Sequence, residues 1–194
     1  MATRCPELAT TRRTALLALL CAPLVATAQA AVPAEVAAEL PGARALGNGR
    51  LTFLGLHIYD VRLWVTAEFK AETFEQAPLA LELEYGRTLY GKLIAERSLK
   101  EMKRVEALSD EQGARWLDEM TQLFPDVTKG DRITGVQQPG AATRFFHNGK
   151  LRGEVRDAEF TRRFFGIWLS PKTSEAALRQ SLLTTPKSPA KAGS

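Results

Sequence analysis

The segment 78–86, PLALELEYG, alternates strictly along its length. Its two faces carry different side chains, Leu79, Leu81, Leu83 and Tyr85 on one and Ala80, Glu82 and Glu84 on the other. Because successive side chains of a β-strand point to opposite faces, this pattern predicts a strand with one buried face and one wet face. Such strands are typical of antiparallel sheets, whereas strands of parallel sheets have near-continuous apolar runs. The segment therefore predicts an antiparallel sheet that is covered on one side.

Predicted strands and predicted helices come in separate runs along the chain. Segment 50–65, RLTFLGLHIYDVRLWV, predicts two strands or one bent strand with a bulge at Gly55. A hairpin is expected at Asn148-Gly149, the strongest turn signal present. Helices are expected at 87–105, after Ser109, after Asp157 and after Ser174, and residues 31–48 predict a lead-in with one short strand or turn. This order favours an α+β fold with an antiparallel sheet and helices on one face.

Residues 1–30 have the pattern of a secretory signal peptide. Arg4, Arg12 and Arg13 precede the apolar run 15–25, and Ala28-Gln29-Ala30 follows as a cleavage site. The run is shorter than the roughly 20 residues that span a bilayer, so no stable membrane insertion is expected after cleavage. The arginine pair leaves both the general and the twin-arginine export route open. We expect a secreted, periplasmic protein.

Removal of the signal peptide changes the composition of what remains. Both cysteines, Cys5 and Cys21, lie in the removed segment, so the mature chain has neither disulfide nor thiolate site. The full chain has a formal net charge of +4, but residues 31–183 carry equal numbers of acidic and basic side chains. This balance argues against nucleic acid as a partner. We expect one domain over 31–183 and a disordered tail, rich in Pro, Ser, Ala and Lys, over 184–194.

The usual signatures of catalysis and of cofactor binding are missing from the sequence. His57 and His147, the two histidines, have no metal-ligand spacing, and His57 is interpreted as a sheet residue. There is no nucleophile elbow, no P-loop and no dinucleotide fingerprint. The sequence indicates neither a metal nor a cofactor, and it contains no signal for the oligomeric state.

One polar feature stands out in the predicted helix 87–105, within LYGKLIAERS. Tyr90 and Arg97 are seven residues apart, which in a helix returns to within about 20° of the same direction. Arg97 therefore falls on or beside the apolar stripe of Leu89, Leu93 and Ile94. This position suits either a surface arginine or a polar site inside a pocket.

Several separated motifs, in order, resemble the bacterial chalcone isomerase-like proteins, which are secreted relatives of plant chalcone isomerase. The motifs are RLTFLGLHIYDVRLWV, LYGKLIAERSLKEM, FPDVTKGDRITGV, FFHNGKLRGEVRDAEFTRRFFGIWL and TSEAALRQSLL. The resemblance covers about residues 44–183. It implies an open-faced β-sandwich with a cleft between helices and sheet. In the enzyme branch this cleft closes the ring of a phenolic ketone, and in the fatty-acid-binding branch it holds a fatty acid.

The resemblance also implies site residues. Thr52 matches the family's strand threonine, Tyr90 its helix tyrosine, and Thr161 its late threonine or serine. Arg97 stands where the enzyme has asparagine. Arg44 and Arg50 both lie in the region of the family's early arginine, and spacing does not choose between them.

These residues favour binding over catalysis. A guanidinium is a poor base at neutral pH, but its planar fork suits a carboxylate. The first hypothesis is an apolar ligand with an acidic head, such as a fatty acid, held by Thr52, Tyr90, Arg97 and Thr161. The second is an isomerase acting on a phenolic enone, with Tyr90 and Thr52 as catalytic candidates. The third is a partner-binding or structural module whose cleft is filled by its own side chains.

Each site residue also has a purely structural interpretation. Tyr90 suits a core aromatic residue with its hydroxyl at the rim, and Thr52 an ordinary strand residue. Arg97 can pair with Glu101 one turn on, and Thr161 can bond the carbonyl one turn back. The aromatic stripe of the helix after Asp157 suits helix-on-sheet packing, and its residues are Phe160, Phe164, Phe165 and Trp168.

Overall fold

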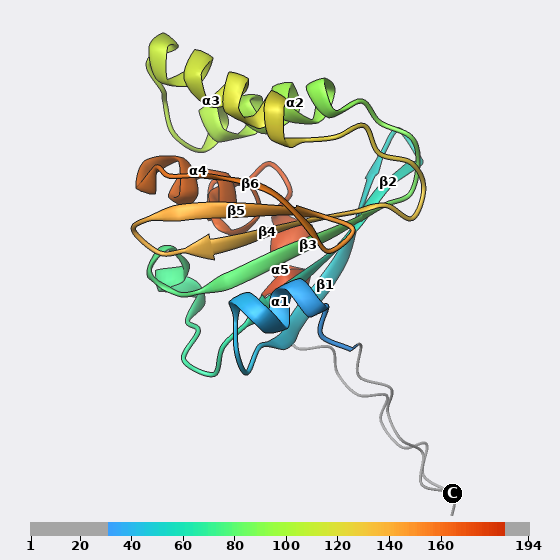
Figure 1. Cartoon of the computed structure of the whole chain (residues 1–194), viewed down its shortest axis with the longest axis vertical. Helices are drawn as coiled ribbons and strands as arrows, with labels where there is room; N and C mark the ends of the chain where they lie inside the picture. Colours follow the sequence, from blue (N-terminus) through green and yellow to red (C-terminus); the bar gives the residue numbers. More distant parts are fainter. Residues whose placement is uncertain (1–30, 185–194) are drawn as a thin grey trace, which may run out of the picture.

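Six antiparallel strands form one sheet in simple chain order (Figure 1). The computed structural model describes residues 31–184, so the predicted signal peptide and nearly all of the predicted tail lie outside the described residues. The strands are β1 (Arg44–Phe53), β2 (Leu56–Val65), β3 (Leu79–Tyr85), β4 (Arg132–Gln138), β5 (Ala142–His147) and β6 (Lys150–Val155). The helices are α1 (Ala34–Glu39), the 3-10 helix η1 (Ala71–Gln76), α2 (Gly91–Val105), α3 (Asp110–Leu123), α4 (Ala158–Leu169) and α5 (Ala176–Leu182).

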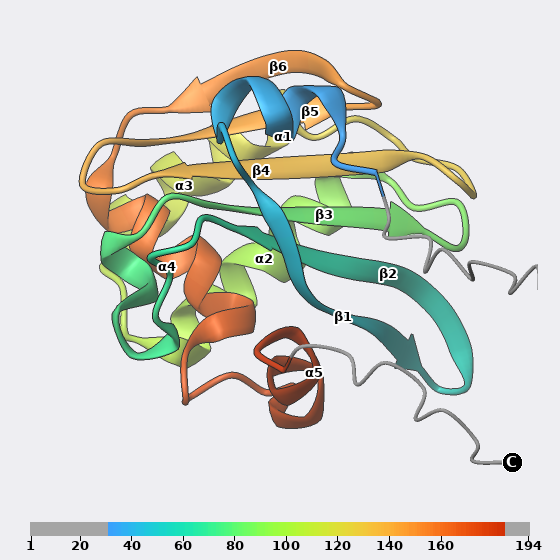
Figure 2. The ribbon, with the colours of Figure 1, turned by 90° about the horizontal axis from the view of Figure 1, so that it is seen from below.

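The two faces of the sheet are covered differently (Figures 1 and 2). Helices α2, α3 and α4 form a layer over one face, where the larger core cluster lies. The short helix α1 packs on the other face, where Val36 and Leu40 contact Trp64 and Ala80. The predicted α+β fold with an antiparallel sheet and a helix layer is confirmed. Within the predicted lead-in 31–48, a strand is present because β1 begins at Arg44, but helix α1 at 34–39 is not predicted.

Strand β3 is more buried than its alternation indicates. The apolar face lies beneath the helix layer as predicted, but the opposite face is wet only at Glu84. Glu82 is 4% exposed, accepting from Arg132 Nη1 at 2.7 Å and from Trp64 Nε1 at 2.9 Å. The alternation predicts a solvated Glu82, and this is wrong because neighbouring strands supply partners for the buried carboxylate.

Two tight hairpins set the register of the sheet at its ends. Leu54 and Gly55 connect β1 to β2 with φ values of +50° and +76°, so the glycine predicted as a bulge is part of a two-residue turn. The β1–β2 pairing is irregular instead at Ala45/Gly47 and at Leu51/Thr52. Asn148 and Gly149 connect β5 to β6 with φ values of +49° and +80°, which confirms the predicted hairpin.

The predicted helix caps are confirmed at two positions and wrong at a third, and the helix predicted at 87–105 begins later, at Gly91. Ser109 caps α3 by accepting from the Gln112 N–H, and Asp157 caps α4 by accepting from Glu159 and Phe160. Ser174 does not cap α5. That helix begins at Ala176, and the Ser174 hydroxyl donates instead to Glu101 Oε2 at 2.8 Å. The Ser174 hydroxyl thus bonds a carboxylate of α2 instead of capping its own helix.

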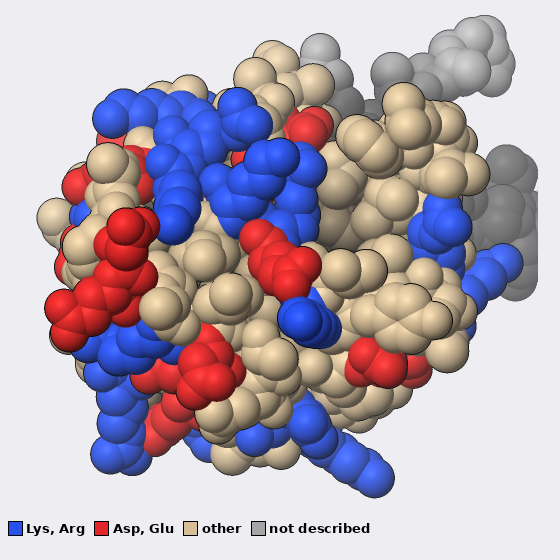
Figure 3. All heavy atoms as spheres, turned by 90° about the horizontal axis from the view of Figure 1, so that it is seen from above, with Lys and Arg blue, Asp and Glu red and all other residues tan. Residues whose placement is uncertain are grey.

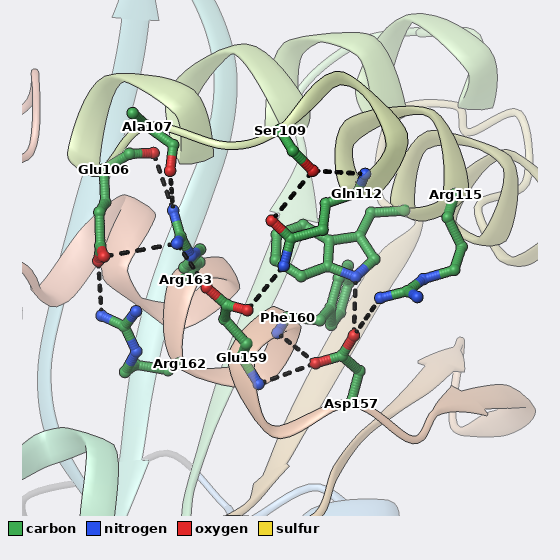
Figure 4. Close-up of polar contacts among 11 residues, drawn as sticks. Glu106, Ala107, Ser109, Gln112, Arg115, Asp157, Glu159, Phe160, Arg162 and Arg163 are labelled. Atoms are coloured by element: carbon green, nitrogen blue, oxygen red, sulfur yellow. Dashed lines mark hydrogen bonds and ion pairs between the residues drawn. The ribbon is translucent and has the colours of Figure 1, made fainter.

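Helix α2 is held mainly by α3 and α4 rather than by the sheet. Arg163 of α4, which is 5% exposed, donates to the carbonyl oxygens of Glu106 and Ala107 in the α2–α3 connection, at 2.9 and 2.8 Å (Figure 4). Its Nη2 lies 2.5 Å from the Glu159 carboxylate. A guanidinium carries five N–H donors in fixed directions, which suits it to binding several acceptors at once. The contacts fasten the end of α2 to α4.

Loss of these contacts should cost more than loss of an exposed ion pair nearby. We expect Arg163→Ala to lower the free energy of unfolding by about 2–3 kcal/mol, because it removes a buried side chain and its hydrogen bonds to two carbonyl groups. Arg162→Ala, which removes the more exposed pair with Glu106, should cost less than about 1 kcal/mol. Urea denaturation measures both values, and equal losses in the two variants would contradict this account.

Candidate ligand-binding cavity

A cavity of about 280 Å³ lies between the helix-covered face of the sheet and helices α2 and α4. Strands β1 to β5 contribute its floor, with β3 supplying Leu81, Leu83 and Tyr85. The wall opposite comes from α2 and from α4. Since α2 packs mainly on α3 and α4, a space remains between it and the strands beneath.

Most of the cavity wall is apolar. Phe124, Phe145 and Phe164 line it and pack edge-on or tilted against one another, with ring centroids 5.1–6.2 Å apart. Phe164 and Trp168 belong to the aromatic stripe predicted to be core. All four residues of that stripe are buried, and these two also reach the cavity. Apolar pockets with a few polar groups are typical of small-molecule sites.

The polar groups in the wall gather around Tyr59. Its hydroxyl accepts from Trp168 Nε1 at 3.0 Å. Burial raises the pKa of the Tyr59 hydroxyl, and Arg97, Glu101 and Glu175 are close enough to act on it. All of these residues line the cavity. The cavity is therefore amphipathic, with its charged groups on the side formed by α2 and the start of α5.

Arg97 lines the cavity and is also paired within its own helix. Its Nη2 lies 2.9 Å from Glu101 Oε1, the pair expected one turn on. The Glu101 side chain is only 8% exposed, and Arg104 at 3.2 Å and Ser174 at 2.8 Å are its further partners. Among the described residues, Arg97 is the one Lys or Arg side chain in the cavity wall. Both interpretations of Arg97, surface ion pair and pocket residue, thus describe the same side chain.

Tyr90 lies outside the cavity wall and is 62% exposed. Helix α2 begins at Gly91, and Tyr90 has the extended φ and ψ of −84° and 133°. The seven-residue spacing aligns side chains only inside a helix, so it does not bring Tyr90 over Arg97. The start of α2 is fixed by close packing, because a Cβ on Gly91 would lie 2.1 Å from the Phe124 carbonyl oxygen.

The remaining predicted residues fall in different places. Thr52 lines the cavity near the β1–β2 hairpin. Thr161 is 2% exposed and does not line it. Its hydroxyl donates to the Asp157 carbonyl oxygen at 2.9 Å and accepts from the Thr143 hydroxyl at 2.9 Å. The structure therefore brings Thr52 and Arg97 to one cavity and leaves Tyr90 and Thr161 outside its wall, while their roles toward a ligand stay predictions.

Neither candidate for the early arginine lines the cavity. Arg50 pairs with Asp60 across the β1–β2 hairpin, at 2.7 and 3.0 Å, and Arg44 opens β1 opposite Val65.

Sequence reasoning missed Tyr59, Tyr85 and Glu101. The alternation of β3 does place Tyr85 on the buried face, but it says nothing of what its hydroxyl contacts. Glu101 is predictable only as the partner of Arg97. Its carboxylate accepts from the Ser174 hydroxyl, which is 73 residues away along the chain.

Exposed apolar side chains surround one end of the cavity. Phe53 and Leu93, which line it, are 57% and 53% exposed, and Leu54 at the hairpin turn is 85% exposed. Figure 3 looks onto the helix layer, and the side toward the β1–β2 hairpin carries fewer charged side chains than the opposite side. A ligand that enters here meets apolar surface first.

Within residues 31–184, no helix is long and apolar enough to cross a membrane. The same residues contain no group of three or more His, Cys, Asp or Glu side chains placed to hold a metal ion.

Comparisons with known proteins agree with this architecture. The sequence matches the chalcone isomerase-like family over residues 49–184, and the chain belongs to this family. An uncharacterized protein of Haemophilus influenzae is 29% identical over 143 residues, which cover 74% of this chain and 69% of that protein. A solved structure, the fatty-acid binding protein AtFAP1 of Arabidopsis thaliana, is similar with a TM-score of 0.59 at 15% identity, covering 74% of this chain and 87% of that one. At that identity the likeness shows the fold.

Replacement by a larger side chain should have different effects at two leucines on the same face of β3. Leu83 lines the cavity, whereas Leu79, on the same face of β3, is fully buried outside its wall. We expect Leu83→Trp to change the free energy of unfolding by less than about 1.5 kcal/mol and to weaken binding of the dye anilinonaphthalene sulfonate at least about tenfold. Leu79→Trp should overpack the core and cost about 3 kcal/mol.

Urea denaturation and dye fluorescence measure these effects. Equal destabilisation by the two substitutions, or unchanged dye binding in Leu83→Trp, would show that the space beneath α2 is not a usable cavity.

Proposed function

We propose that this protein is an exported binding protein that holds an apolar small molecule with an acidic head, such as a fatty acid. One observation carries the proposal: an apolar cavity of about 280 Å³ with a single cationic side chain, Arg97, in its described wall. The fatty-acid binding protein of the same fold supports this class of ligand. The signal-peptide pattern of residues 1–30 supports export to the periplasm.

The pairing of Arg97 with Glu101 fits an exchange of partners. A ligand carboxylate that takes the Arg97 guanidinium competes with Glu101 for it. Glu101 retains Arg104 at 3.2 Å and the Ser174 hydroxyl at 2.8 Å, so its buried charge keeps partners after the exchange. Because the Arg97 side chain is 55% exposed, the acidic head lies near solvent and the chain lies inside.

The other two hypotheses have less support. Ring closure of a phenolic enone relies on Tyr90 as a donor to the ketone, and Tyr90 does not line the cavity. A module whose cleft is filled by its own side chains would leave no space of this size beneath α2. We therefore propose binding without chemistry.

Isothermal titration calorimetry with decanoate tests the proposal. A methylene group occupies about the volume of a water molecule, about 30 Å³ in the liquid, so the cavity suits a chain of about nine carbons. We expect Arg97→Ala to weaken decanoate binding by about two- to fivefold, as an exposed ion pair does, and to leave decanol binding unchanged. Glu101→Gln should strengthen decanoate binding, because it removes the competing carboxylate.

Lys100→Ala is the matched control, since Lys100 is an exposed cation of the same helix outside the cavity wall. It should leave both affinities unchanged. If the wild-type protein binds neither decanoate nor longer fatty acids, the proposed function is wrong. If Arg97→Ala weakens decanoate and decanol equally, Arg97 does not hold the head.

A further inference from the structure

Two tyrosines of the cavity wall face each other across strands β2 and β3. Tyr59 and Tyr85 are directly opposite in the antiparallel register, so both side chains lie on the helix-covered face. Their rings are 6.0 Å apart in an edge-on arrangement. Both residues line the cavity, and Tyr85 is only 3% exposed.

The hydrogen bonds of the two hydroxyl groups are incomplete. Tyr59 accepts from Trp168, which leaves its own hydroxyl hydrogen uncommitted. Within residues 31–184, no protein group hydrogen-bonds to the Tyr85 hydroxyl. Two effects act on its pKa, which are its burial and the neighbouring Tyr59. Burial raises the pKa of both tyrosines, so both hydroxyls are protonated donors at neutral pH. Each has a proton to donate toward the cavity.

A buried tyrosine hydroxyl normally has a partner. Three positions of the same wall, Phe124, Phe145 and Phe164, carry phenylalanine, which would fill the Tyr85 position without leaving a polar group unpaired. A plain alkyl chain gives no partner to the Tyr85 hydroxyl. An oxygen atom on the ligand would give one, and this requirement is independent of the charged groups around Arg97.

The two hydroxyls lie in different electrostatic surroundings. Arg97, Glu101 and Glu175 act on the pKa of Tyr59, whereas Tyr59 is the one neighbour that acts on that of Tyr85. Among the described residues, the charged groups that act on Tyr59 therefore give the Tyr85 hydroxyl no hydrogen-bond partner.

We propose that Tyr85 donates a hydrogen bond to a neutral oxygen in the chain of the ligand, so that the preferred ligand is an oxygenated acid, with a hydroxyl or keto group, rather than a plain fatty acid. This inference rests on the proposed function and names its ligand class more narrowly. The acidic head lies at Arg97, and Tyr85 selects for the second oxygen.

Calorimetry with decanoate and a series of hydroxydecanoates, in which the hydroxyl moves along the chain, tests this selection. We expect at least one isomer to bind the wild-type protein about two- to tenfold more tightly than decanoate, the gain that one net hydrogen bond gives. Tyr85→Phe should abolish this preference while decanoate binds as tightly as before or more tightly. Thr121→Val, which removes an exposed hydroxyl of α3 outside the cavity wall, is the control and should keep the preference.

Two results would overturn the inference while the proposed function stands. One is that decanoate binds but no isomer binds more tightly. The other is a preference that persists in Tyr85→Phe, which would assign the Tyr85 hydroxyl to a water molecule instead. If the wild-type protein binds none of these acids, the proposed function and this inference both fail.

Discussion

The position of helix α2 determines the rest of the site. Because α2 rests mainly on α3 and α4, the strands beneath it are left with a space that their own side chains do not fill. Arg163 fastens the α2–α3 connection to α4, and Gly91 allows the start of α2 to approach the Phe124–Pro125 backbone closely. The hydrogen bonds of the buried Arg163 side chain and these close backbone contacts thus keep a cavity open where collapse would otherwise bury more apolar surface.

The chemistry of the cavity follows from which side chains this arrangement turns inward. Strand β3 supplies an apolar floor that ends in Tyr85, and α2 supplies Arg97 together with its partner Glu101. A charge already paired on the protein suits reversible binding of an anionic head, because the ion pair exchanges one carboxylate for another. The exposed apolar residues near the hairpin give an uncharged approach to the same space. Binding of an amphipathic small molecule accounts for all three features.

The sequence predicts much of the fold because its local signals agree with one another. The alternation of 78–86, the Asn148-Gly149 turn and the caps at Ser109 and Asp157 each specify local geometry, and the structure confirms the elements. The sequence does not predict contacts between side chains that are far apart along the chain. Glu82 is buried with partners on the neighbouring strands, and Ser174 bonds Glu101 rather than capping its own helix. The prediction for Tyr90 is wrong for a local reason. Helix α2 begins one residue later, at Gly91, so Tyr90 does not share the helical spacing of Arg97.

The central claim is that the space beneath α2 holds one amphipathic molecule. Native mass spectrometry of the protein purified from its own host, followed by solvent extraction, tests this claim most directly. The account predicts one bound acid per chain, released by solvent, with at least one oxygen beyond its carboxylate. A protein that carries the mass of the chain alone, and gains no adduct when mixed with fatty or hydroxy fatty acids, would contradict it.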